Sequence, residues 1–136
     1  MSTFDYIVAK YKITDLGGIV HLPNTRYGLS ALFHDLGYKI GAEIGVGYGG
    51  NAENILKNTN LEHLYGIDPF AHYDNSNSVM NVSQEDFDDI HNLVKQKLSP
   101  FAGRFGLIRK TSVKAANEVP DNLDFVYIDG EHSYEG

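Results

Sequence analysis

Ala42–Gly50 reads Ala-Glu-Ile-Gly-Val-Gly-Tyr-Gly-Gly and joins an apolar, strand-like stretch to a helical one. Glycine allows the backbone to turn tightly and removes the Cβ atom that would keep a ligand at a distance. The first amide groups of the following helix have no partner within the helix and point at whatever lies beside the turn. The stretch is typical of a nucleotide-binding strand-to-helix junction and predicts a site for an adenosine-containing cofactor.

The composition is that of an ordinary globular protein. The chain has 136 residues, enough for one domain with a hydrophobic core, and 42% of them are hydrophobic and 21% charged. No apolar run approaches about 18 residues, so no membrane span is expected. The N-terminus lacks the basic and apolar regions of a signal peptide. Cysteine is absent, which excludes disulfides and cysteine nucleophiles and is typical of a cytoplasmic protein.

The charge balance limits the class of partner. The formal net charge is −7, whereas proteins that read a phosphate backbone need clustered Lys and Arg. The few basic residues are scattered along the chain, and Arg109-Lys110 is the one adjacent pair. We therefore expect a small-molecule acceptor or ligand and no nucleic acid.

Apolar patterns predict strands that alternate with helices. Helices are expected at 25–36, 51–58, 83–98 and 112–118, and strands at 39–46, 61–67, 105–109 and 123–128. This alternation favours an α/β fold with a doubly wound, mostly parallel sheet. Residues 1–24 are interpreted as an N-terminal arm or short helix, and residues 25–136 as the domain.

Polar residues follow each of the four predicted strands. They are the glycine turn at 45–50, Asp68, the pair at 111–112, and the segment 129–135. Ligands bind beyond the carboxyl ends of the strands in open parallel sheets. These four strand ends therefore predict one common cleft.

The chain ends at Gly136, soon after the fourth predicted strand. Doubly wound sheets usually continue further, and a last strand without a following helix leaves one edge and one face uncovered. We expect either a domain that is incomplete at its C-terminus or a four-stranded domain that covers its edge by forming a homodimer.

Three motifs in chain order resemble those of class I S-adenosylmethionine-dependent methyltransferases. They are Glu43-x-Gly45-x-Gly47-x-Gly49, then Gly-Ile-Asp-Pro at 66–69, then Asp-Phe-Val-Tyr-Ile-Asp-Gly-x-His-Ser-Tyr-Glu at 124–135. The last motif is similar to that of the macrocin-type sugar O-methyltransferases. The resemblance covers about residues 25–136. It implies a Rossmann-like fold, S-adenosylmethionine as cofactor, and O-methylation of a small hydroxylated molecule.

The resemblance also implies roles for the residues that bind the cofactor. Gly45, Gly47 and Gly49 would line its amino-acid end, and Glu43 would support that turn. Asp68 would accept hydrogen bonds from the two ribose hydroxyls. A carboxylate suits two hydroxyl donors because it is an acceptor only, and a strand-end acid about 20 residues after a glycine turn meets a ribose in dinucleotide-binding folds as well.

The remaining roles fall on four residues. Phe70 would flank the adenine, and Ser112 would lie near the adenine edge. Asp129 would lie beside the methionine portion, where metal-dependent relatives place a ligand to a divalent cation such as Mg²⁺. His132 would face the acceptor, so Asp129 and His132 are the catalytic candidates. The further acidic ligand of those relatives comes from a strand beyond the end of this chain.

Other interpretations stay open at this stage. The glycine run could be a structural turn only, or the dinucleotide fingerprint Gly45-x-Gly47-x-x-Gly50, which would favour NAD or FAD. Asp68 and Asp129 could each be a strand-end turn residue. The chain could also bind the cofactor without catalysing a reaction. The segment 70–82 is long enough to be a lid or a surface loop.

Overall fold

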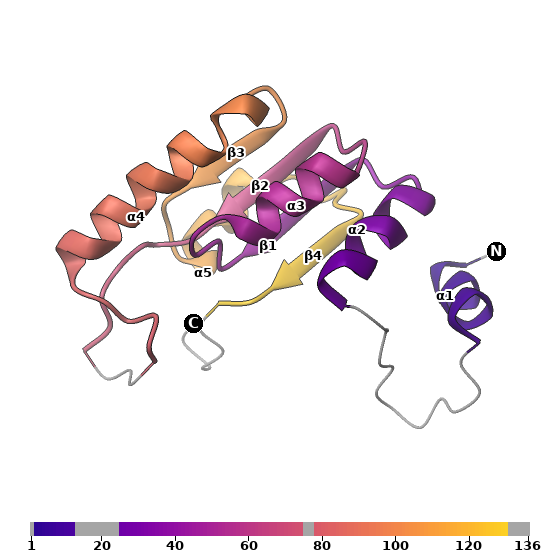
Figure 1. The fold of residues 1–136 in the computed structure, drawn as a ribbon, viewed down its shortest axis with the longest axis horizontal. Helices are drawn as coiled ribbons and strands as arrows, with labels where there is room; N and C mark the ends of the chain where they lie inside the picture. Colours follow the sequence, from indigo (N-terminus) through magenta and orange to yellow (C-terminus); the bar gives the residue numbers. More distant parts are fainter. Residues whose placement is uncertain (1, 13–24, 75–77, 131–136) are drawn as a thin grey trace.

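The computed structural model describes residues 2–12, 25–74 and 78–130. Its helices and strands follow one another along the chain as drawn in Figure 1. The strands are β1 Ile40–Ile44, β2 His63–Ile67, β3 Phe105–Ile108 and β4 Phe125–Ile128. The helices are α1 Thr3–Tyr11, α2 Thr25–Asp35, α3 Gly50–Asn58, α4 Gln84–Lys97 and α5 Ser112–Ala115, with short 3₁₀ turns η1 Ser99–Phe101 and η2 Ala116–Glu118.

The predicted elements in this part of the chain are confirmed, and most of their ends differ by no more than two residues. The one larger difference is that the helix expected over 112–118 is divided into α5 and η2. The N-terminal arm forms α1, which begins with a capping box between Ser2 and Asp5. The expected loop at 13–24, the centre of the 70–82 loop, and residues 131–136, including His132, lie outside the described residues.

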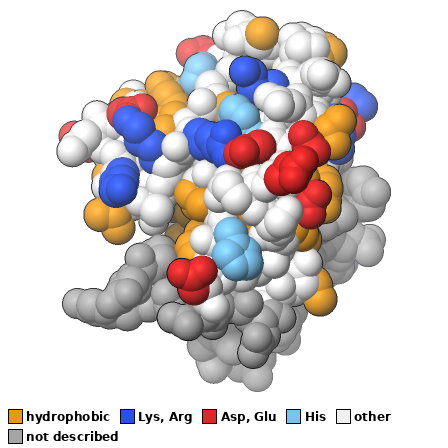
Figure 2. All heavy atoms as spheres, turned by 90° about the vertical axis from the view of Figure 1, so that its left-hand side faces the viewer, with side chains coloured by type: hydrophobic (Ala, Val, Ile, Leu, Met, Phe, Trp, Pro, Cys, Tyr) orange, Lys and Arg blue, Asp and Glu red, His pale blue; other side chains and the backbone are white. Residues whose placement is uncertain are grey.

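All four strands run parallel in the order β3-β2-β1-β4. The expected parallel α/β sheet is therefore confirmed, and the four carboxyl ends meet at one edge of the sheet. Figure 2 views the molecule from the side toward which the strands run. Described Lys and Arg side chains are interspersed there with Asp and Glu and form no single basic patch.

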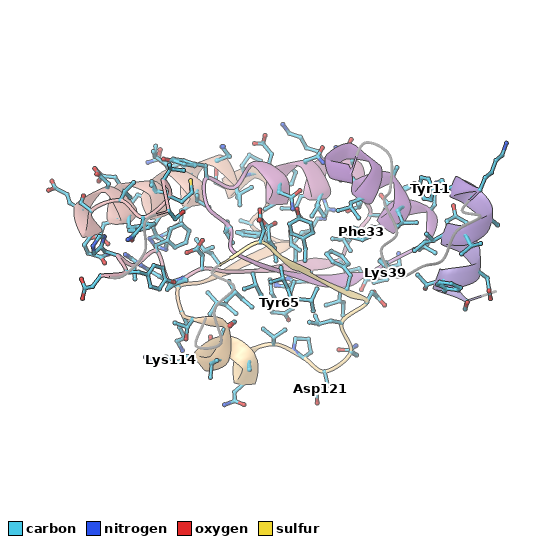
Figure 3. The ribbon with its side chains drawn as sticks, turned by 90° about the horizontal axis from the view of Figure 1, so that it is seen from below. Tyr11, Phe33, Lys39, Tyr65, Lys114 and Asp121 are labelled. Carbon is cyan, nitrogen blue, oxygen red and sulfur yellow. The ribbon has the colours of Figure 1, made fainter. Side chains whose placement is uncertain are left out.

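The helices divide unequally between the two faces of the sheet. Figure 3 shows α2, α3 and α4 on one face and α5 with η2 on the other. The main core lies on the first face, where α3 buries Ile55 and Leu56 and α4 buries Val94. Phe33 of α2 stacks on Phe125 of β4 with ring centroids 4.0 Å apart. Burial of such side chains is the main favourable term in folding.

The opposite face of β4 is exposed within the described residues. Val126 is 48% and Ile128 is 60% accessible to solvent, and β4 is an edge strand of the described sheet. The expected homodimer through this strand stays a prediction. No helix among the described residues combines the length and the apolar character that crossing a bilayer requires.

Candidate functional site

The glycine turn after β1 lies between the ends of β2 and β4. The amide of Gly45 donates to the carbonyl of Ile67 at 2.8 Å, and the amide of Asp129 donates to the carbonyl of Ile44 at 2.8 Å. These two bonds continue the sheet beyond its regular strands. They hold three strand ends together at the edge where the sequence predicts the site.

The glycines of the turn adopt conformations that other residues rarely take. The φ angles of Gly45, Gly47 and Gly49 are +91°, +55° and +81°, in the region that favours glycine. A Cβ on Gly45 would lie 2.3 Å from the backbone oxygen of Asp129. A Cβ on Gly47 would meet a single described atom within 4 Å, the Met80 methyl at 3.7 Å. The turn is thus packed tightly at Gly45, whereas the described residues leave room for a ligand at Gly47.

Helix α3 begins directly after this turn. Gly49 is its N-cap and makes no side-chain cap, and the amide of Glu53 donates to the Gly49 carbonyl at 3.0 Å. The amides of residues 50–52 precede this bond in the first turn of the helix. This end of a helix favours an anionic group such as a carboxylate. Lys97 of α4 donates to the Tyr48 carbonyl at 3.0 Å and fixes the turn from the other side.

Asp68 follows β2 and joins the turn to the neighbouring strand. Its Oδ2 accepts from the amide of Gly47 at 3.0 Å, and its Oδ1 accepts from the amide of Phe70 at 2.8 Å. Each carboxylate oxygen has two lone pairs, so each retains one free acceptor position after these bonds. The half-buried carboxylate can therefore accept from two further hydroxyls. Its position at the strand end is as expected, and its ribose-binding role stays a prediction.

Glu43 is the most buried acid of the site. It is 1% exposed, and Asn51 of α3 donates to its Oε2 at 3.4 Å. Burial raises the pKa of the Glu43 carboxyl to about 8. The Asn51 hydrogen bond opposes this rise, and the negative charges of Asp129 and Asp68 add to it. Glu43 is therefore largely protonated at neutral pH, which the sequence alone did not predict.

Asp129 follows β4, beside the glycine turn, and is exposed. Its charge reaches Glu43, as the pKa of that residue shows. Among the described residues, no three His, Asp or Glu side chains come together as a set that could hold a metal ion. His132 and the neighbouring acids, Glu131 and Glu135, lie outside the described residues. The catalytic and metal-binding roles of Asp129 and His132 stay predictions.

Ser112 lies on the β3 side of Asp68, and Phe70 lies two residues after Asp68 in the segment that follows β2. Ser112 is the first residue of α5, which follows β3, and the amide of Asp68 donates to the carbonyl of Ile108 at the end of β3 at 3.2 Å. Phe70 is 1% exposed, belongs to the core cluster and contacts the ring of His91 edge-on at 5.2 Å. The ring thus packs in the core, and this burial does not favour the predicted contact with adenine.

Three side chains in or near the site were absent from the sequence interpretation. Asn51 contacts Glu43, while Arg109 and Gln84 both donate to the carbonyl of Phe70. Arg109 directly follows β3, so its place at a strand end was a usable signal. Gln84 lies in the first turn of α4, far from any strand end in sequence, and no motif marks it.

Comparison with family models identifies one match. Residues 42–136 match the family described as a methyltransferase domain. The match begins inside β1 and includes all four strand ends of the site. No curated protein shows a significant match to the chain.

Three solved structures of similar fold are distant from this chain in sequence. Cofactor-bound Rv0187 from MTB superposes with a TM-score of 0.56 at 11% identity, over 94% of this chain and 53% of that chain. The O-methyltransferase from Bacillus cereus in complex with SAH has a TM-score of 0.54 at 14% identity, over 96% of this chain and 55% of that chain. A proposed RNA methyltransferase, PH1948 from Pyrococcus horikoshii, has a TM-score of 0.52 at 14% identity, over 98% and 62%.

These structural matches concern the fold. The chain spans between 53% and 62% of the length of the three solved chains. At such low identity the superpositions support a common arrangement of strands and helices. The reaction, the acceptor and the partners of this chain have to be argued from its own residues.

Proposed function

The chain belongs to the methyltransferase domain family, and from that premise we propose that it binds S-adenosylmethionine at the glycine turn and methylates a hydroxyl of a small acceptor. The Asp68 carboxylate carries the proposal. It is tied to the glycine turn through Gly47 and retains two acceptor positions. This is the group that a ribose with two neighbouring hydroxyls requires.

The other residues of the site fit the remaining parts of such a cofactor. The amides at the start of α3 suit a carboxylate, and the acids Glu43 and Asp129 suit an ammonium or a sulfonium. The room above Gly47 admits a ligand close to the backbone. A cation beside Glu43 would lower its raised pKa again, so the bound state favours the charged carboxylate.

The proposed reaction requires this chain mainly to position the two reactants. When bound, S-adenosylmethionine would supply an electrophilic methyl group, which would bond to the acceptor oxygen as its bond to sulfur breaks and S-adenosylhomocysteine leaves. The strand ends serve to hold the two reactants in line, which is the main contribution a protein makes to such a displacement. The acceptor hydroxyl loses its proton during the transfer, and Asp129 is our candidate for receiving it.

A small acceptor is favoured over RNA. The net charge is −7, and basic and acidic side chains are interspersed on the face in Figure 2. A nucleic-acid acceptor requires a basic surface. The Bacillus cereus neighbour is described as an O-methyltransferase, which agrees with a hydroxylated acceptor, including the sugar that the third motif favours.

Replacement of Asp68 by Ala is expected to weaken binding of S-adenosylhomocysteine by at least roughly 100-fold, because two charge-assisted hydrogen bonds contribute about 1.5–3 kcal/mol each. The Asp68→Asn variant keeps one acceptor oxygen, so its affinity for S-adenosylhomocysteine should lie between those of Asp68→Ala and the wild type. Calorimetric titration measures each affinity. The control variant is Asp121→Ala, on the loop that leads into the amino end of β4, away from the site (Figure 3).

Three outcomes of this titration would contradict the proposal in different ways. Equal affinity of the wild type and Asp68→Ala would remove Asp68 from the cofactor site. Binding of NAD in place of S-adenosylhomocysteine would replace the methyltransferase proposal by a dinucleotide-dependent one. Tight binding without methyl transfer to a panel of sugars and phenols would leave a cofactor-binding protein without this activity.

Use of a divalent cation is a separate prediction, which rests on the resemblance around Asp129. The described residues do not form a set of ligands, so no step of the reaction is derived through a metal. If Mg²⁺ is used, EDTA should abolish methyl transfer and change the affinity for S-adenosylhomocysteine by less than about twofold, since the metal would act on the acceptor hydroxyl. Equal rates with EDTA and with Mg²⁺ would exclude the metal.

A further inference from the structure

Phe70 has an unusual backbone for an aromatic residue. Its φ angle is +46°, a left-handed conformation that is strained for a residue other than glycine. Such a conformation persists when the surrounding structure fixes it from several sides. Phe70 is the second residue after Asp68, and its amide donates to Asp68 Oδ1 at 2.8 Å. The strain therefore lies directly beside the carboxylate that carries the proposed function.

The carbonyl groups around Phe70 are held by side chains from two other elements. Arg109, after β3, donates from Nη2 to the Phe70 carbonyl at 3.2 Å and from Nε to the Pro69 carbonyl at 3.4 Å. Gln84 of α4 donates from Nε2 to the same Phe70 carbonyl at 3.0 Å. One peptide carbonyl thus receives two side-chain donors.

Asp88 joins these two donors to each other. Its Oδ1 forms an ion pair with Arg109 and accepts from Gln84 at 3.1 Å. Hydrogen bonds from Arg109 and Gln84 lower the pKa of the Asp88 carboxyl, so it stays charged at neutral pH. The ring of Phe70 is meanwhile buried against His91. Amide, carbonyl and side chain of Phe70 are all fixed.

We propose that Arg109 and Gln84 are positioning residues for the nucleoside part of the cofactor. They lock Phe70 in its left-handed conformation and so hold the Asp68 carboxylate in the orientation that meets the ribose hydroxyls. Without them Phe70 relaxes to an ordinary conformation, its amide leaves Asp68 Oδ1, and the carboxylate turns away. This inference rests on the proposed function of Asp68, and it adds the device that orients that residue.

A double-mutant cycle on the affinity for S-adenosylhomocysteine tests the inference. Arg109→Ala is expected to weaken binding about 10-fold in the wild-type background and less than about twofold in the Asp68→Ala background, because the two residues act through one contact. The affinity of Arg109→Lys should be close to that of Arg109→Ala, since an ammonium cannot bridge two carbonyls and a carboxylate as a guanidinium does. If Arg109→Ala acted only by lowering stability, it would weaken binding by the same factor in both backgrounds.

Matched variants separate this role from general effects. Lys110→Ala changes the neighbouring residue, which pairs with Glu118, and should leave the affinity unchanged. If Arg109→Ala fails to fold, Gln84→Ala carries the same test, with an expected loss of about threefold that disappears in the Asp68→Ala background.

Independent, multiplying effects of Arg109 and Asp68 would overturn the inference, as would full affinity of Arg109→Ala. A wild-type chain that does not bind S-adenosylhomocysteine would instead refute the proposed function. The two failures are therefore distinguished by the wild-type titration.

Discussion

Glu43→Gln is expected to be more stable than the wild type at pH 8.5, by roughly 4–5 kcal/mol, and to differ from it by less than about 1 kcal/mol at pH 5. The reason is the burial of Glu43, which is 1% exposed and has a pKa raised from 4.5 to about 8. A neutral amide of the same shape retains a hydrogen bond to Asn51 and carries no charge that must be desolvated.

The direction of this pH dependence follows from whether the folded or the unfolded chain binds the proton. Below pH 4.5 the carboxyl is protonated in the folded and the unfolded chain, so it adds no pH dependence. Between about 4.5 and 8 the folded chain keeps the proton and the unfolded chain loses it. Each pH unit in this window lowers the free energy of unfolding by up to about 1.4 kcal/mol through this one group. Above pH 8 both states are ionised and the loss is complete.

Urea unfolding of both proteins at pH 5, 6.5 and 8.5 measures this difference. Other titrating groups contribute similarly to both curves, so the gap between them isolates Glu43. Glu62→Gln is the matched control, since Glu62 is exposed and its variant should follow the wild type at every pH. A gap that stays constant from pH 5 to pH 8.5 would contradict the burial-driven shift.

The same substitution should weaken S-adenosylhomocysteine binding, because an amide cannot become the negative partner of an ammonium. Stability gained together with affinity lost is the usual relation at a functional site. The chain keeps a destabilising acid at the end of β1, and the proposed cofactor gives that acid a partner.

The parts of the site that follow from strand ends could be predicted from the sequence. The glycine turn and Asp68 end β1 and β2, and neighbouring parallel strands end at one edge of a sheet. Their direct bond, from the Gly47 amide to Asp68, follows from that arrangement. The sequence pattern was sufficient because both residues lie within a few positions of a strand.

The residues that depend on tertiary packing could not be predicted in the same way. The neutral state of Glu43 depends on α3 closing over the end of β1, where Asn51 meets it. Phe70 follows an Asp-Pro pair and was interpreted as a ligand contact, but the left-handed backbone and the nearby α4 place its ring in the core. Arg109 reaches Asp88 only because β3 and α4 converge on the segment after β2.

The glycines of the motif look alike in the sequence, yet they should respond very differently to a methyl group. Gly45→Ala is expected to lower the free energy of unfolding by at least about 3 kcal/mol, since it adds strain at a left-handed φ to a severe overlap. The new Cβ would lie 2.3 Å from the Asp129 oxygen and 2.6 Å from the Gly130 nitrogen. Both are backbone atoms, so the overlap can be relieved only if the ends of β1 and β4 separate at the site.

Gly50→Ala supplies the contrast within the same motif. A Cβ at Gly50 meets no described atom within 4 Å, and its φ is not in the left-handed region. Alanine at this first position of α3 should therefore stabilise the fold by about 0.4–1 kcal/mol, by restricting the unfolded chain. Thermal and urea unfolding of the two variants should therefore show changes in stability of opposite sign. A Gly45→Ala protein as stable as the wild type would mean that the ends of β1 and β4 do not meet as described, and the candidate site built on that contact would have to be abandoned.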